Sequence, residues 1–277
     1  MKTLIIGAKG MLGQDLAKVF SEEELTLWDR EDIDITDKEV VYNKITELQP
    51  ELILNAAAYN DVDGAEKNEE IAMQVNAHGP GNIAGTAKKI NATLVHYSTD
   101  YVFDGDNKDG YKEDDPKDPQ SVYAKSKSMG EVEVIKNCKK FYIIRLSKLF
   151  GSPAISVNAK KSFVDTMLNL AKEKSELNVV DEELSSPTYS SDLARQTKKI
   201  IESKMPYGIY HVTNSGACTW YEFANEIFAI KGIDVKINSV PGSFYPRPAK
   251  RPMYSILLNT KLDKLRSWQE ALKDYLK

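Results

Sequence analysis

The chain has 277 residues, of which 42% are hydrophobic and 28% are charged, the balance of an ordinary soluble globular protein. Its formal net charge of −4 argues against a nucleic-acid-binding protein, which usually carries a basic face. No apolar run approaches the roughly 18 residues that span a bilayer, so we expect no membrane partner. Cys138 and Cys218 form neither a metal-ligand spacing nor a disulfide framework, and the expected setting is the reducing cytoplasm.

Short β-branched apolar runs alternate with longer amphipathic segments in the first half of the chain. We expect strands at 3–6, 25–28, 52–54, 93–97 and 142–144. We expect helices at 11–20, 38–48, 71–90 and 123–136. Continuous apolar strands alternating with helices predict a parallel sheet that is covered on both faces. The predicted fold class is therefore α/β, a Rossmann-like doubly wound parallel sheet.

Beyond residue 150 the pattern changes, because prolines and short polar stretches become frequent. Helical periodicity persists near 162–173, 191–202 and 220–230. We interpret residues 1–150 as a dinucleotide-binding Rossmann domain and residues 151–277 as mainly a smaller substrate-binding lobe. Some of the C-terminal segments are expected to return to the main sheet.

A glycine-rich turn follows the first expected strand. Gly7, Gly10 and Gly13 give the spacing G-x-x-G-x-x-G. Glycines let the backbone turn tightly and approach a diphosphate, which the N-terminus of the following helix stabilises. A glycine turn without a ligand is the simpler alternative. Its place after the first strand of a βαβ pattern favours dinucleotide binding.

Charged residues at the end of the second expected strand bear on the choice of cofactor. Asp29 stands where an acid binds the ribose 2′-hydroxyl of NAD, and Arg30 suits the 2′-phosphate of NADP. Asp29 favours NADH and Arg30 favours NADPH, so the sequence leaves the choice between the two cofactors open. The simpler alternative is that both residues lie in a solvated turn that binds no cofactor. Asp34 and Ile35 form a polar–apolar pair placed to line the adenine.

Tyr123 and Lys127 are one helical turn apart, so on a helix they share one face. A phenol is a poor acid at neutral pH, and a nearby ammonium favours its ionised form. A Y-x-x-x-K match alone also fits a solvated helix face, but here it follows the fourth strand in a chain with the glycine turn. The third partner is expected where that strand ends, and a hydroxyl of Ser98 or Thr99 is placed to hold a substrate carbonyl.

These residues resemble one family, the dTDP-4-dehydrorhamnose reductases, within the extended short-chain dehydrogenases. The resemblance runs over nearly the whole chain and is most specific in the string S-T-D-Y-V-F-D-G at 98–105. Its other matching pieces are 7–13, 55–59, Tyr123 and Lys127 with Gly130 and Glu131, 186–188, and Arg251 with Pro252 and Ser255.

The resemblance implies reduction of the C4 ketone of dTDP-4-dehydro-L-rhamnose by NADPH or NADH, giving dTDP-L-rhamnose for cell-surface polysaccharide. It also implies that Thr99 holds the carbonyl, that Tyr123 donates the proton, and that Lys127 tunes the tyrosine and binds the nicotinamide ribose. The cofactor-lining positions that it implies are Gly10, Met11, Leu12, Asp34, Ile35, Ala57, Ala58, Tyr59 and Asn60. The substrate-facing positions are Thr99, Asp100, Val102 and Phe103.

The chain departs from the family at Lys148, where members usually have a tryptophan that packs on the substrate. A lysine offers no aromatic surface, so Lys148 is a candidate for setting a different sugar. Arg247 and Arg251 lie in a basic stretch that is either a solvated loop or a grip on the diphosphate of a nucleotide sugar.

Two further functions compete with the reductase. One is a reductase or epimerase of another 4-keto nucleotide sugar. The other is a non-catalytic dinucleotide-binding regulatory subunit, like the β subunit of methionine adenosyltransferase among the family's relatives. The three histidines are far apart in the sequence, so we expect no metal site, and the oligomeric state is left as monomer or homodimer.

Overall fold

The structure is a computed structural model that describes residues 1–156 and 162–277. Its centre is a six-stranded sheet in the order β2-β1-β3-β4-β5-β9, with every neighbouring pair parallel. The predicted doubly wound α/β fold is therefore confirmed. The strands are β1 (Lys2–Ile6), β2 (Glu24–Trp28), β3 (Leu52–Asn55), β4 (Thr93–Thr99), β5 (Phe141–Leu146) and β9 (Gly208–His211).

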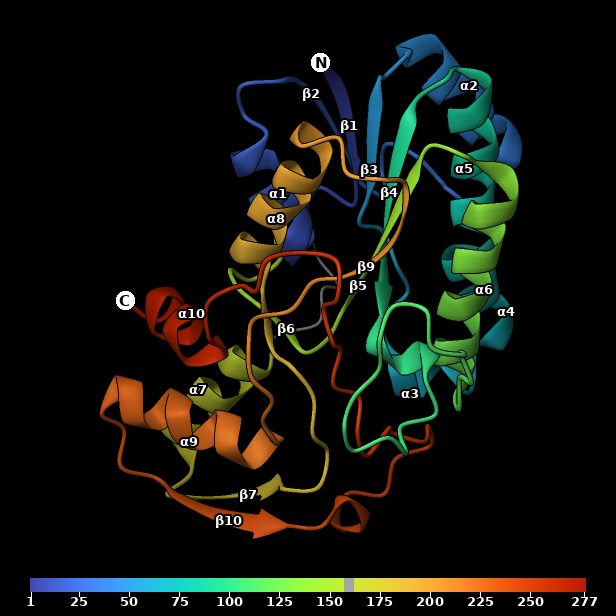
Figure 1. Ribbon diagram of the computed structural model, residues 1–277. Helices are drawn as coiled ribbons and strands as arrows, with labels where there is room; N and C mark the ends of the chain where they lie inside the picture. The colour runs from blue at the N-terminus through green and yellow to red at the C-terminus, as the bar shows by residue number, and fades with distance from the viewer. Residues whose placement is uncertain (157–161) are drawn as a thin grey trace.

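Helices cover both faces of this sheet (Figure 1). One face carries α1 (Met11–Val19) and α8 (Ser190–Glu202), and the other carries α2 (Lys38–Leu48), α5 (Gly79–Lys89) and α6 (Val122–Asn137). The central strands are apolar at successive positions because both of their faces are buried. Alternate side chains of β3 show this directly, since Ile53 packs with the α2 and α5 side and Leu54 with the α1 and α8 side.

The helix expected at 71–90 is interrupted by a π turn. It is built from α4 (Glu69–Met73), the π-helix η1 (Gln74–His78) and α5, and a short α3 (Val62–Ala65) precedes it. The wider turn brings the carbonyl of Asn76 against Gly130 of α6, where an added Cβ would lie 2.1 Å from that oxygen. The hydrophobic periodicity of the sequence cannot reveal a single π turn, because only one extra residue is inserted. Single π turns often occur at functional sites.

A second, smaller core lies beyond the carboxyl ends of the strands, at the bottom of Figure 1. Its helices α9 and α10 each begin with a capping box, at Thr219 and Ser267. Its elements are α7 (Phe163–Glu173), α9 (Trp220–Lys231), α10 (Trp268–Tyr275), β7 (Glu176–Val180), β10 (Lys236–Val240), β6 (Leu149–Phe150) and β8 (Thr188–Tyr189). The turns η2 (Asp100–Val102) and η3 (Gly242–Phe244) complete the described structure.

Two elements after residue 150 belong to the main sheet rather than to the smaller core. Strand β9 pairs with β5, and α8 packs on α1. The chain thus leaves the sheet after β5, builds part of the lobe, returns for α8 and β9, and leaves again. A domain boundary at residue 150 stays a prediction.

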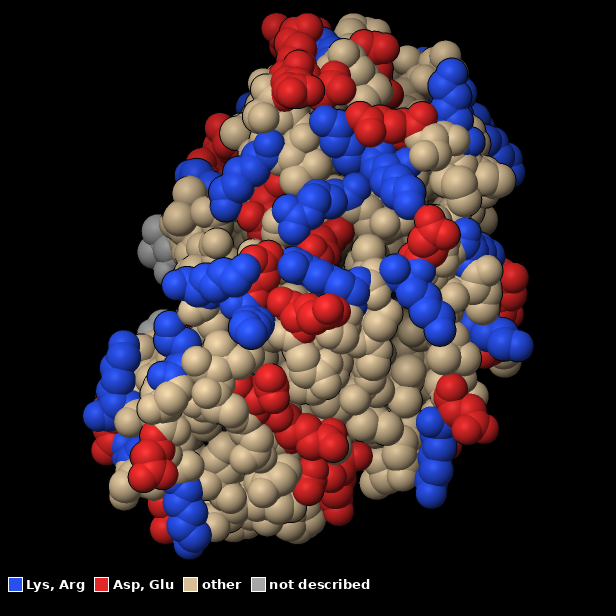
Figure 2. Space-filling view, turned by 60° about the vertical axis from the view of Figure 1, so that its left-hand side comes forward, with Lys and Arg blue, Asp and Glu red and all other residues tan. Residues whose placement is uncertain are grey.

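The described residues include no helix long and apolar enough to cross a bilayer. On the face drawn in Figure 2, basic and acidic side chains are interleaved, so that face presents no continuous basic band.

Candidate active site

A cavity of about 1900 Å³ lies between the carboxyl ends of the sheet strands and the C-terminal lobe. In open α/β sheets the ligand crevice forms where the strand order reverses. Here the reversal falls between β1, which runs outward to β2, and β3, which starts the other half of the sheet. The cavity extends from this point to the lobe. A ligand at the strand ends and a second ligand against the lobe would therefore share one continuous cavity.

The glycine turn closes one end of the cavity at the N-terminus of α1. Gly7 has a φ of 83°, and a Cβ there would lie 2.8 Å from the backbone nitrogen of Ala57. A Cβ on Gly13 would lie 2.1 Å from the carbonyl oxygen of Gly7. Only glycine fits both positions, so the turn brings bare backbone to the first turn of α1, as a dinucleotide diphosphate requires.

Every predicted cofactor position lines this cavity. The fixed carboxylate of Asp29 lies at its far end, where it accepts hydrogen bonds of 2.9 Å from the backbone nitrogens of Lys9 and Arg30. The lining positions are Gly7, Gly10, Met11, Leu12, Gly13, Asp29, Arg30, Asp34, Ile35, Ala57, Ala58, Tyr59, Asn60, Tyr123 and Lys127.

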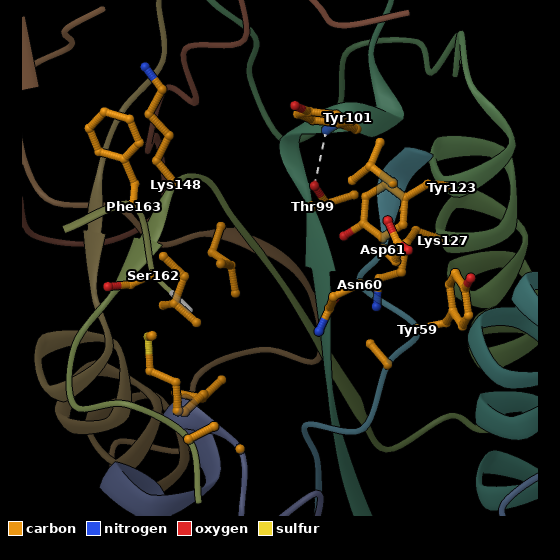
Figure 3. A pocket seen from close by; sticks show the side chains of 18 of the residues that line it. Tyr59, Asn60, Asp61, Thr99, Tyr101, Tyr123, Lys127, Lys148, Ser162 and Phe163 are labelled. Carbon is orange, nitrogen blue, oxygen red and sulfur yellow. Dashed lines mark hydrogen bonds between the residues drawn. The ribbon is translucent and has the colours of Figure 1, made fainter. Parts of the chain in front are cut away.

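The predicted catalytic residues meet at the middle of the cavity (Figure 3). Tyr123 and Lys127 project from the first turns of α6, which begins where the Ser121 hydroxyl accepts the backbone N–H of Ala124. Thr99 ends β4, and its hydroxyl lies beside the phenol of Tyr123. Burial raises the pKa of Tyr123 to about 12, and the hydrogen bond with Thr99 opposes this shift. The phenol therefore stays protonated at neutral pH, as a proton donor must.

Lys127 is buried, with its ammonium 2.7 Å from the carbonyl oxygen of Tyr97. Burial lowers the pKa of Lys127 to about 8, and the nearby carboxylate of Glu131 opposes the fall. Glu131 is itself held by two 2.8 Å hydrogen bonds from Arg145 and one of 3.1 Å from Lys117. Burial acts to raise the pKa of Glu131, but these cations outweigh it and hold the pKa low.

Asn76, which no sequence motif marked, holds the loop after β3 that carries the predicted cofactor positions 57–60. The side chain of Asn76 accepts a hydrogen bond of 2.8 Å from the backbone N–H of Tyr59 and donates one of 3.0 Å to its carbonyl. The same amide donates to the hydroxyl of Ser126 on α6, at 3.0 Å. The π turn that contains Asn76 thus ties the loop after β3 to the catalytic helix.

Asp100 lines the cavity at the catalytic centre, although it is almost entirely buried. Hydroxyls of Thr99, Ser147 and Ser255 donate to its carboxylate at 3.0, 2.8 and 2.6 Å. Burial raises the pKa of Asp100 against the effect of these bonds. Its contact with a sugar stays a prediction, and what the structure shows is a carboxylate joining the ends of β4 and β5 to the C-terminal segment.

Two predicted substrate residues do not reach the cavity. Val102 and Phe103 are 0% and 1% exposed, and they form a small apolar cluster with Tyr111 and Leu257. Phe103 stacks on the ring of Tyr111 at 4.4 Å between ring centroids. These two side chains therefore pack the loop after β4 and face this small core.

Lys148 lies on the opposite wall from Thr99 and Tyr123 (Figure 3). Its ammonium donates to the carbonyl oxygens of Glu183 and Cys218 at 3.0 and 2.8 Å, and it lies 4.3 Å from the ring centroid of Trp220. Burial lowers the pKa of Lys148 to about 8, against the neighbouring Cys218 and Glu183. The lysine ammonium is therefore bonded to protein groups, and its effect on the choice of sugar stays a prediction.

Both predicted diphosphate arginines line the cavity and are paired with carboxylates. Arg247 pairs with Glu183, and Arg251 pairs with Asp63 of α3 at 2.7 Å. The backbone N–H of Ala249 also donates to Asp63, at 3.2 Å. These contacts hold the C-terminal segment against both the lobe and the cofactor half.

Sequence reasoning missed three residues of the lobe-side wall. Phe163 and Trp220 have ring centroids 4.5 Å apart, and the indole nitrogen of Trp220 donates to Glu183 at 3.0 Å. No motif marks them, because they come from helix starts and a loop far apart in the sequence. The described residues contain no group of three or more His, Cys, Asp or Glu side chains placed to hold a metal ion.

The parallel sheet, the glycine turn and the Thr99–Tyr123–Lys127 group define an oxidoreductase of the short-chain dehydrogenase/reductase type. The family model described as RmlD substrate binding domain matches residues 1–277. The chain belongs to this family.

Relatives of known name match over nearly their full length. A dTDP-4-dehydrorhamnose reductase of Aggregatibacter actinomycetemcomitans is 38% identical, covering 99% of this chain and 97% of the relative. The spore coat polysaccharide biosynthesis protein SpsK of Bacillus subtilis is also 38% identical, with 99% and 96% covered.

Solved structures agree with this assignment. The structure of a dTDP-4-dehydrorhamnose reductase from Clostridium acetobutylicum has a TM-score of 0.95 at 42% identity and covers 100% of this chain and 98% of that one. The Bacillus anthracis reductase in complex with NADP has a TM-score of 0.94 at 36% identity, with 99% of both chains covered.

Proposed function

We propose that this chain reduces the C4 ketone of dTDP-4-dehydro-L-rhamnose to dTDP-L-rhamnose, with NADPH or NADH as the reductant. The observation that carries the proposal is the meeting of Thr99, Tyr123 and Lys127 in a cavity that joins the glycine turn to the lobe. Family membership and named relatives over the full length support the same activity.

The residues present fit a nicotinamide dinucleotide. The bare backbone of the glycine turn suits the diphosphate, Asp29 suits a ribose, and Lys127 faces the middle of the cavity. When bound, the reduced nicotinamide supplies a hydride to the ketone carbon. Lys127 would hold the nicotinamide ribose, and the loop tied by Asn76 would lie along the cofactor.

Tyr123 gives its phenolic proton to the carbonyl oxygen as the ketone carbon gains its new hydrogen. The raised pKa of the phenol keeps that proton in place until negative charge develops on the oxygen. Thr99 stands beside the phenol and orients the carbonyl toward it. The Lys127 ammonium favours the phenolate that this step leaves behind.

The lobe-side wall would hold the nucleotide. Arg247 and Arg251 line the cavity there, and arginine's planar fork suits diphosphate oxygens. For this contact the arginines would turn from their present carboxylate partners, Glu183 and Asp63. We also propose that the chain works in the cytoplasm, as a monomer or a homodimer, and its two unpaired, buried cysteines suit a reducing compartment.

A second substrate is favoured by one observation, Lys148 in the lobe-side wall. A relative from Streptomyces antibioticus, 35% identical, is named a probable dTDP-4,6-dihydroxy-2-methyloxan-3-one 4-ketoreductase. The alternative is therefore reduction of another 4-keto nucleotide sugar by the same residues.

The test follows NADPH and NADH absorbance with purified protein and dTDP-4-dehydro-L-rhamnose made in place by its upstream enzymes. Sugar-dependent oxidation supports the proposal, and other 4-keto nucleotide sugars are compared by kcat/KM. Cofactor binding without oxidation of any keto sugar would reject it in favour of a regulatory dinucleotide-binding subunit.

A further inference from the structure

The ribose end of the cavity has a carboxylate fixed by backbone groups. Asp29 follows β2, and its two oxygens accept separate hydrogen bonds of 2.9 Å from the backbone nitrogens of Lys9 and Arg30. The backbone N–H of Asp29 donates in turn to the carboxylate of Asp32 at 2.8 Å. The acceptor that a ribose hydroxyl needs is thus in place without any movement of the chain.

One basic side chain close to this carboxylate, that of Lys9, is paired with another residue. Lys9 lies in the glycine turn, and its ammonium bonds the carboxylate of Glu31 at 2.9 Å. The hydrogen bond with Glu31 raises the pKa of Lys9, and the charges of Asp29 and Asp32 add to the effect. Glu31 lines the cavity, but Lys9 is not among the residues that do.

The wall that would surround the 2′ position is therefore mainly acidic. Asp29, Glu31 and Asp34 line the cavity near Arg30, the cation beside them among the described residues. The charge of Arg30 also acts on Asp34, whose pKa is lowered mainly by hydrogen bonds from Thr36. A 2′-phosphate carries up to two negative charges and a 2′-hydroxyl carries none, so the acidic wall disfavours the phosphate.

We propose that this ribose site selects NADH over NADPH, and that Glu31 enforces the choice by holding Lys9 away from the 2′ position. The proposal rests on the proposed function only in requiring that a nicotinamide dinucleotide binds. The fold itself allows NADP, which a relative holds. The selection comes from this chain's own side chains.

The test measures equilibrium dissociation constants of NADH and NADPH by quenching of protein fluorescence, with no sugar present. The native chain is expected to bind NADH about tenfold more tightly. Glu31→Gln is expected to tighten NADPH binding about threefold to fivefold, the range of an exposed ion pair, and to change NADH binding less, because a 2′-hydroxyl carries no charge. Asp29→Asn should weaken NADH binding, because the amide is a poorer acceptor for the ribose hydroxyl.

Two controls isolate the mechanism. Asp263→Asn removes another exposed carboxylate that pairs with a lysine at 2.9 Å, remote from the ribose end, and should change neither constant. Lys9→Met combined with Glu31→Gln should return NADPH binding to the native level, because the gain needs the freed ammonium.

Three results would overturn the inference: NADPH binding as tight as NADH, no gain in Glu31→Gln, or a gain that survives in the double variant. Each of these leaves the reductase proposal standing. Failure of the native chain to bind either dinucleotide would overturn both.

Discussion

The catalytic wall of the cavity and the wall opposite it are built in different ways. Thr99, Tyr123 and Lys127 stand on β4 and α6, and all three are buried on a hydrogen-bonded foundation. The opposite wall, with Lys148 and Arg247, is assembled from short elements and loops that an ion pair and hydrogen bonds to backbone carbonyls hold together. The catalytic geometry is therefore set by the protein core, whereas the substrate wall rests on pairwise contacts between distant segments. Such a wall is free to differ between relatives without disturbing the chemistry.

The largest effect on the rate is expected at the catalytic wall. Tyr123→Phe removes the proton donor but keeps the ring that packs edge-on against Tyr101, at 5.8 Å between centroids. We expect kcat to fall by about 10² to 10⁴, with the NADH dissociation constant within about twofold of the native value. Steady-state rates and fluorescence quenching measure the two. Native turnover in this variant would remove Tyr123 from the mechanism.

The next largest effect is expected on stability, at the buried ion pair of Glu131 and Arg145 near the catalytic residues. Glu131→Gln leaves the buried guanidinium of Arg145 without its countercharge, and loss of one partner of a buried pair costs about 3–5 kcal/mol. Urea unfolding measures the change. Glu133→Gln, on the same helix but partly exposed, is the matched control and should stay within about 0.5 kcal/mol of the native chain. Equal effects in both variants would mean that the network is not a special support.

The pH dependence of the rate sharpens the same contrast. With its pKa lowered to about 8, Lys127 is charged below that pH and neutral above it. Because the ammonium favours the phenolate, kcat/KM for the ketone should fall as pH rises through about 8. Lys127→Arg, whose guanidinium keeps its charge, should be slower at neutral pH but show no such decline. A flat native profile up to pH of about 9.5 would contradict this assignment.

The smallest effect is expected at the substrate wall. Lys148→Met keeps the length of the side chain but leaves the carbonyls of Glu183 and Cys218 without their donor. We expect a loss of about 1–3 kcal/mol in unfolding free energy and a rise in KM, with kcat within about twofold. A hundredfold loss of kcat would place Lys148 in the catalytic machinery instead.

The contrast between the catalytic wall and the lobe-side wall also explains which site residues could be predicted from the sequence. The glycine turn with Gly7 and Gly13, and the spacing of Tyr123 and Lys127, each depend on residues close together in the sequence. Such patterns can therefore be recognised from the sequence alone. The sheet followed from continuous apolar strands, because burial on both faces leaves that signal. Trp220 left no signal, because its place in the wall depends on the packing of a separate lobe.

Two further outcomes show where motif matching misleads. Val102 lies in the string that carries the family resemblance, yet its side chain packs in the protein core and does not line the cavity. Asn76 escaped notice because a π turn shifts it into position, and one inserted residue leaves helical periodicity almost intact.

The late return of β9 has a consequence for synthesis of the chain on the ribosome. When residues up to β5 have emerged, the outer edge of β5 still lacks its neighbour, and α8, which later packs on α1, has not been made. An unpaired strand edge is a template for association with other chains. The guanidinium of Arg145 also lacks its contact with His211 of β9 at this stage, a contact of 3.4 Å in the folded chain. Until the β9 segment leaves the exit tunnel, the edge of β5 is therefore open to association with other chains.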